Sequence, residues 1–81
     1  GMKSRTLKIR EFPVVVEKDI DGSFFALAPS LQGCYTSGKT LGEALDNIKD
    51  AIRLHVADRA VAKETVPKRK LVSFTSVEVL A

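Results

Sequence analysis

Three carboxylates lie close together in the first third of the chain, at Glu17, Asp19 and Asp21. Clustered carboxylates can hold divalent metal ions for phosphodiester hydrolysis, so this group is one candidate for chemistry. The same residue types are also common at the polar tip of a hairpin. The hairpin interpretation is favoured. A metal site would also need carboxylates from the helix that is predicted after Thr40, and its carboxylates Glu43, Asp46 and Asp50 lie opposite the apolar stripe of that helix. No metal or cofactor is predicted.

The other reactive side chains are isolated from one another in sequence. Cys34 is the only cysteine, so an internal disulfide is excluded and a small buried apolar role is expected. His55, the only histidine, is expected to be half-buried near the end of a helix. The basic triplet Lys68-Arg69-Lys70 has no interleaved aromatic residue and is expected to be a solvated loop. These side chains predict no catalytic site, so we expect a protein that is not an enzyme.

Length and composition predict one globular domain over residues 1–81. A chain of 81 residues with 44% hydrophobic and 28% charged residues can bury one core and has no material for a second. The longest apolar run is far shorter than the about 20 residues of a membrane-spanning helix. The first residues also lack the charged-then-apolar layout of a signal peptide. A cytoplasmic location without membrane association is therefore expected.

The net charge of +3 is unevenly distributed along the chain. Residues 1–12 and 51–81 each carry a net charge of +3, whereas residues 13–50 carry −3. A nucleic-acid-binding protein usually concentrates cations on its recognition element. The acidic middle of the chain therefore favours a protein partner with a basic surface, and direct DNA binding is not expected.

Four segments have the composition of β-strands. They comprise Thr6–Glu17, Ser23–Ala28, Cys34–Ser37 and Leu71–Leu80. Pro13 cannot donate to a central ladder, so the first strand either lies at a sheet edge there or begins again after a bulge. Residues 19–22 supply the turn chemistry of a hairpin between the first two strands.

From Thr40 the hydrophobic period changes from two to 3.6 residues, which predicts an amphipathic helix of about five turns. Thr40 and Glu43 have the spacing of a capping box, which defines the start of the helix. Its outer face carries Glu43, Asp46, Lys49, Asp50 and Arg53. Its apolar stripe comprises Leu41, Leu45, Ile48, Ile52 and His55 or Val56, with Ala44 and Ala51 beside it.

The order of elements predicts an α+β fold, β-β-β-α-β, with a small antiparallel-type sheet and one helix packed on one face. Adjacent residues on a strand point to opposite faces, so Phe24 and Phe25 cannot both face the helix. One of them needs cover from elsewhere. Because a single helix cannot cover four strands, we expect the protein to self-associate through sheet edges or through its aromatic face.

Residues from about 13 to 60 resemble the N-terminal domain of HicB-like antitoxins. The resemblance rests on a hairpin, a loop and a capped helix in the same order. The matching residues are Pro13, Val15, Glu17, Asp19, Asp21-Gly22, Phe24, Ala28-Pro29, Leu31, Gly33-Cys34, Ser37-Gly38, Thr40, Glu43-Ala44, Asn47-Ile48 and Ala51-Ile52. The chain departs from the family at Gly42, where an acidic residue is usual, and no DNA-binding domain is expected after the last strand.

The resemblance implies a partial ribonuclease-H-like sheet and an antitoxin role. The partner would be a small basic ribonuclease toxin, HicA-like, whose RNA-binding surface the antitoxin covers. Glu17, Asp19, Asp21 and Phe25 are the expected contact positions. Two alternatives remain open: a divalent-metal nuclease that uses the hairpin carboxylates with Glu78, and an orphan homo-oligomeric binding domain.

Overall fold

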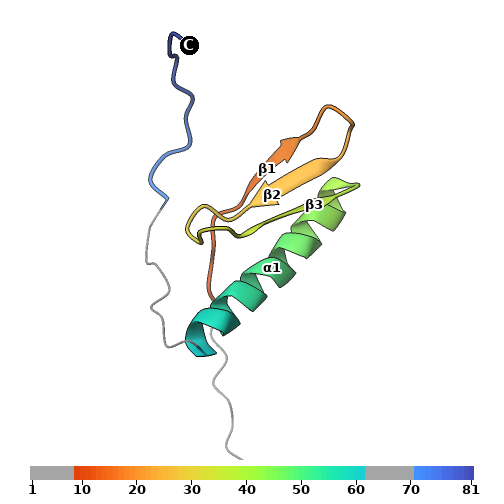
Figure 1. Ribbon diagram of the computed structural model, residues 1–81, viewed down its shortest axis with the longest axis vertical. Helices are drawn as coiled ribbons and strands as arrows, with labels where there is room; N and C mark the ends of the chain where they lie inside the picture. Colours follow the sequence, from red (N-terminus) through yellow and green to blue (C-terminus); the bar gives the residue numbers. More distant parts are fainter. Residues whose placement is uncertain (1–8, 62–70) are drawn as a thin grey trace, which may run out of the picture.

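The computed structural model describes residues 9–61 and 71–81. Its elements follow in the order β1 (Val15–Lys18), β2 (Phe24–Leu27), β3 (Tyr35–Gly38) and α1 (Leu41–Val61). The strands form an antiparallel sheet in the order β1-β2-β3, and α1 lies along one side of it (Figure 1). The predicted α+β arrangement of three strands followed by one packed helix is therefore confirmed.

The β1–β2 hairpin turns through Ile20, Asp21 and Gly22. The Asp19 amide donates to the Ser23 carbonyl at 2.8 Å, and the Gly22 amide donates to the Asp19 carbonyl at 3.0 Å. Gly22 has a φ of 89°, a left-handed conformation that glycine adopts without steric cost. The turn predicted over residues 19–22 is confirmed, with glycine at the position that requires it.

β1 is shorter than the predicted strand over residues 6–17. Residues 1–8 lie outside the described part, and residues 9–14 carry no strand. The β1–β2 register pairs Val15 with Leu27, so its continuation by two residues would set Pro13 opposite Pro29. Neither proline has an N–H to donate, and the ladder ends before this pair. β1 is nevertheless an edge strand, which is one of the two arrangements that Pro13 predicted.

The predicted cap of α1 is present with one difference. The Glu43 amide donates to the Thr40 hydroxyl at 3.0 Å, as a capping box requires. The Glu43 carboxylate also reaches back, but it accepts from the Lys39 amide at 3.2 Å instead of the Thr40 amide. Two backbone donors at the helix start are therefore satisfied, and α1 begins at Leu41.

α1 approaches the sheet closely where β3 ends. A Cβ at Gly38 would lie 2.8 Å from the Ala44 Cα and 2.9 Å from the Glu43 carbonyl carbon. Only a glycine leaves room for this contact, which brings the first turn of the helix directly onto β3. Small residues on both elements therefore determine how closely α1 and the sheet pack.

The core lies between the sheet and α1 and is built mainly from small side chains. Its buried residues are Ala26, Ala28, Leu31, Cys34, Ala44 and Ile48. Partly buried side chains surround them at Phe12, Val14, Val16, Phe24, Ala51, Ile52 and Val56. The helix stripe is thus centred on Ala44 and Ile48.

Two predicted members of that stripe do not reach the core. Leu41 is 49% exposed and Leu45 is 39% exposed. The close contact between Gly38 and Ala44 turns Ala44 toward the sheet, which leaves these two leucines at the rim. Leu41 and Leu45 fit the helical period of apolar residues, but the close packing of Gly38 against Ala44 determines which face of α1 is buried.

The predicted last strand over residues 71–80 is absent from the sheet. Residues 71–81 carry neither helix nor strand and are exposed throughout. They run past the β1 side of the molecule and end away from the sheet (Figure 1). Alternating hydrophobicity favours an extended chain, but a strand also needs a hydrogen-bonding neighbour, and this segment does not enter the ladder of its own sheet.

Candidate functional site

The face of the sheet opposite α1 presents two rows of side chains. The strand register places Val15, Leu27 and Tyr35 in one row, and Glu17, Phe25 and Ser37 in the next. Their neighbours Val16 and Ala26 belong to the core on the helix side, so these six residues point the other way. We call this surface the outer sheet face.

An aromatic pair dominates the outer sheet face. The rings of Phe25 and Tyr35 lie with their centroids 5.7 Å apart and their planes tilted by 32°. Phe25 is half-buried and Tyr35 is 64% exposed. Together with Leu27 and residues 28–29 and 31–34 of the following loop, they line a shallow hollow of about 250 Å³. Phe24 packs against the core instead, which confirms that the two phenylalanines face opposite ways.

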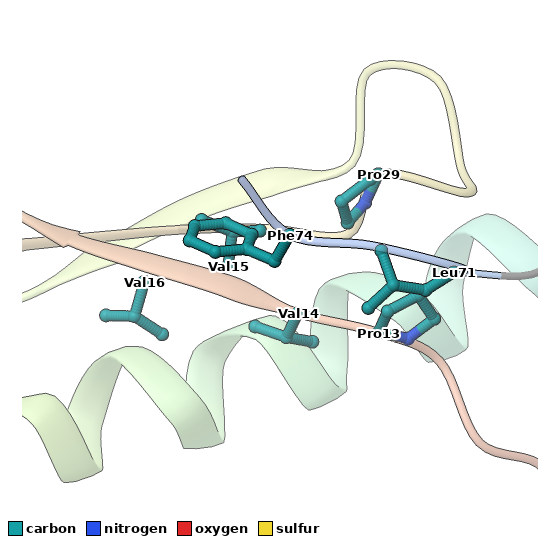
Figure 2. A pocket seen from close by; sticks show the side chains of 7 residues that line it. All are labelled: Pro13, Val14, Val15, Val16, Pro29, Leu71 and Phe74. Atoms are coloured by element: carbon teal, nitrogen blue, oxygen red, sulfur yellow. The ribbon is translucent and has the colours of Figure 1, made fainter. Parts of the chain in front are cut away.

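A second hollow, of about 300 Å³, lies near the start of β1. It is lined by Pro13, Val14, Val15, Val16, Pro29, Leu71 and Phe74. Figure 2 shows Val14 and Val16 directed toward the helix, whereas Val15 lies on the opposite side together with Phe74. The start of the C-terminal segment therefore lies against the outer sheet face near Val15.

The carboxylates of Asp19 and Asp21 bond to their own turn. Asp19 accepts from the Ile20 amide at 2.7 Å, and Asp21 accepts from the Ser23 hydroxyl at 2.6 Å and from the Ser23 amide at 2.9 Å. The hydrogen bonds from Ser23, the hydroxyl first, lower the pKa of Asp21 below its usual 3.8. Both aspartates are exposed at the end of the sheet.

The structure brings two of the four predicted contact residues together. Glu17 and Phe25 are cross-strand partners on the outer sheet face. Asp19 and Asp21 lie in the adjoining hairpin, one turn beyond them. Tyr35 completes the aromatic surface but was not among the predicted contacts, because only the register between β2 and β3 places it beside Phe25.

The described residues do not gather ligands for a metal ion. Within residues 9–61 and 71–81, no group of three or more His, Cys, Asp or Glu side chains is close enough to hold one. The helix carboxylates of Glu43, Asp46 and Asp50 are exposed. Asp50 instead pairs with Arg53 on the surface at 2.9 Å.

Cys34 and His55 occupy the environments predicted for them. Cys34 is buried, and its burial raises the pKa of the thiol above the usual value of 9.0. His55 is half-buried on α1. The triplet at residues 68–70 lies outside the described residues. In the part of the chain that is described, no helix has the length and apolar composition to cross a membrane.

Comparison with known proteins gives a consistent result across sequence and structure. Residues 12–78 match the model of the family described as HicB_like antitoxin of bacterial toxin-antitoxin system. The chain is 37% identical over 65 residues to UPF0150 protein ssr1765 of Synechocystis, covering 80% of this chain and 82% of that protein. It is 41% identical over 58 residues to UPF0150 protein Ta0767 of Thermoplasma acidophilum, covering 72% and 84%.

The same relationship is visible in a solved structure. The crystal structure of the N-terminal domain of Burkholderia pseudomallei antitoxin HicB matches with a TM-score of 0.63 and 28% sequence identity. The match covers 83% of this chain and 72% of the crystallised one. With a family match that spans most of its length, the chain belongs to the HicB-like antitoxin family of bacterial toxin–antitoxin systems.

Proposed function

We propose that this protein is an antitoxin that neutralises a small basic ribonuclease toxin, HicA-like, by covering its RNA-binding surface. Membership of the HicB-like family supports the antitoxin role. We choose the outer sheet face as the binding surface because its aromatic pair, Phe25 and Tyr35, adjoins the hairpin carboxylates. We expect this face, with Glu17, Asp19, Asp21 and Phe25, to contact the toxin.

The composition of this face fits a complex with a basic protein. Aromatic side chains at the centre of an interface often contribute most of its binding energy, and Phe25 and Tyr35 are packed together but not covered by α1. Glu17 lies beside Phe25, and the hairpin aspartates lie at the rim. Rim charges mainly raise the association rate and the specificity for a partner of opposite charge.

The proposed role needs no catalysis by this chain. The competing nuclease hypothesis requires the hairpin carboxylates to converge with Glu78 on a metal ion. Asp19 and Asp21 instead accept hydrogen bonds from their own turn. The geometry of these two residues therefore favours a structural and binding role over metal ligation.

Three further features belong to this proposal. We expect the protein to act in the cytoplasm, where a ribonuclease toxin would meet its substrate. We expect no direct DNA binding by residues 1–81, whose middle segment is acidic. We also expect the chain to self-associate, because one helix covers only one face of the sheet.

Co-expression with the product of the neighbouring small reading frame tests the antitoxin role. That product should arrest growth when expressed alone, and this chain should restore growth. An untoxic neighbour, or a toxic one that this chain does not neutralise, would exclude the proposed role for that pair.

Matched charge reversals test the surface. Glu17→Lys and Asp46→Lys change the net charge equally, but Glu17 lies on the outer sheet face and Asp46 is exposed on α1. We expect Glu17→Lys to weaken toxin binding at least about tenfold, roughly 1.4 kcal/mol, while Asp46→Lys stays near wild type. Phe25→Ser should weaken binding further. Equal effects of the two lysine variants would show that the outer sheet face has no special role.

A further inference from the structure

Among residues 9–61 and 71–81, no strand pairs with β1 on the side away from β2, so the backbone groups of β1 alternate between β2 and this edge. In an antiparallel pair, residues that exchange hydrogen bonds alternate with residues whose N–H and C=O groups point away from the partner strand. The bond from the Asp19 amide to the Ser23 carbonyl makes this pair a hydrogen-bonded one. The register then directs the N–H and C=O groups of Val14, Val16 and Lys18 outward, away from β2.

The opposite edge of the sheet is partly covered. The bond from the Ala28 amide to the Cys34 carbonyl sets the alternation between β2 and β3, so the backbone groups of Tyr35 and Ser37 point outward. The Asn47 side-chain amide donates to the Ser37 carbonyl at 2.9 Å. α1 therefore satisfies an edge carbonyl of β3, whereas no bond from the described residues covers the outward groups of β1. Open edges invite pairing with another strand.

The C-terminal segment has the composition of a strand but does not pair with the described sheet. Residues 71–80 are rich in β-branched and aromatic side chains. Val72 is 91% exposed, Val77 is 81% exposed and Val79 is 78% exposed. Its first residues lie over the start of β1 on the outer sheet face, where Phe74 and Val15 line the same hollow (Figure 2), but they form no ladder with β1. The segment then continues past the sheet (Figure 1), and its last apolar side chains, Val77, Val79 and Leu80, are exposed.

We propose that residues 71–80 of one copy form a strand along the β1 edge of a second copy, with the exchange made in both directions. This proposal specifies the surface for the self-association proposed above and does not depend on the toxin. Residues 62–70 separate the segment from α1 and can span up to about 30 Å when extended, which is long enough to reach a neighbouring molecule. A twofold exchange extends each sheet to four strands and leaves neither β1 edge open.

Static light scattering and amide hydrogen exchange test the proposal together. The full chain should have twice the monomer mass of 8.8 kDa, and a chain ending at Lys70 should be monomeric. The outward amides of Val14, Val16 and Lys18 should exchange at least about tenfold more slowly in the full chain than in the shortened one. Because residues 71–81 are exposed, the shortened chain keeps every residue of the core.

Two proline variants provide a matched control. Thr75→Pro removes a backbone donor in the middle of the segment, and Ala81→Pro does so beyond its end. Thr75→Pro should give a monomer and Ala81→Pro a dimer.

A dimer that persists in the shortened chain would place the contact elsewhere. A monomeric full chain would overturn the exchange, and slow exchange of the β1 amides in such a monomer would show that the segment pairs within its own chain. Toxin binding is tested separately by Glu17→Lys and Phe25→Ser, so either proposal can fail without the other.

Discussion

The contact between Gly38 and the first turn of α1 predicts opposite effects for the same substitution at two glycines. In Gly38→Ala, the new Cβ would lie 2.8 Å from the Ala44 Cα and 2.9 Å from the Glu43 carbonyl carbon. Ordinary contacts between carbon atoms are about 3.5–4.0 Å long. The colliding atoms are backbone atoms of a capped helix, so relief requires α1 to move away from β3.

Gly42→Ala is the matched control. Gly42 is the second residue of α1, and a Cβ there would meet nothing within 4 Å. Alanine has a higher helix propensity than glycine by up to about 1 kcal/mol, so this variant should be more stable than wild type.

Overpacking such as that in Gly38→Ala typically costs about 1–3 kcal/mol. Because backbone atoms are involved, we expect this variant to lose at least about 2 kcal/mol of unfolding free energy. For a domain of this size that corresponds to a fall in Tm of roughly 8–16 °C. Urea unfolding followed by circular dichroism at equal protein concentration measures both variants. An unchanged unfolding free energy for Gly38→Ala, or equal losses in the two variants, would refute the close-contact argument.

Three other predictions concern the core and the hairpin. Ile48→Ala should lower the free energy of unfolding by about 2–5 kcal/mol in urea titrations, because Ile48 is one of the two largest fully buried side chains; a loss below about 1 kcal/mol would contradict its burial. Gly22→Ala should cost about 1–2 kcal/mol at a φ of 89°, and Gly22→Asn should recover part of that loss in the same assay. Asp21 should titrate below 3.8 in NMR experiments, and Ser23→Ala should raise that midpoint. The stability from the lowered pKa of Asp21 is present above the unfolded-state value near 3.8 and is lost as the pH falls through the folded-state value.

Local chemistry in the sequence determined the hairpin and the helix start. Asp19 to Gly22 can form a tight turn whatever surrounds them, because their side chains and the glycine φ satisfy the turn internally. Thr40 and Glu43 likewise satisfy backbone donors at the start of α1. The alternation of side chains along a strand also separated Phe24 from Phe25 before any partner was known. Two of the predicted contact residues, Glu17 and Phe25, thus lie on the same face.

Features that depend on contacts between distant residues were decided only by the tertiary structure. Tyr35 joins Phe25 through the β2–β3 register, and Asn47 covers the β3 edge through a bond across ten residues. Gly38 lets Ala44 pack onto the sheet and so leaves Leu41 and Leu45 at the rim, although the helical period predicts all three on or beside one stripe.

The C-terminal segment, residues 71–81, also depends on contacts with distant residues. Its alternating pattern predicts a strand, which the structure does not contain, because the pattern holds no information about which edge is available to pair with it. A strand is stabilised by hydrogen bonds to a neighbour, so its formation depends on a surface built by other residues. Turns and caps, by contrast, satisfy their donors within a few residues, and for that physical reason they can be predicted from the sequence alone.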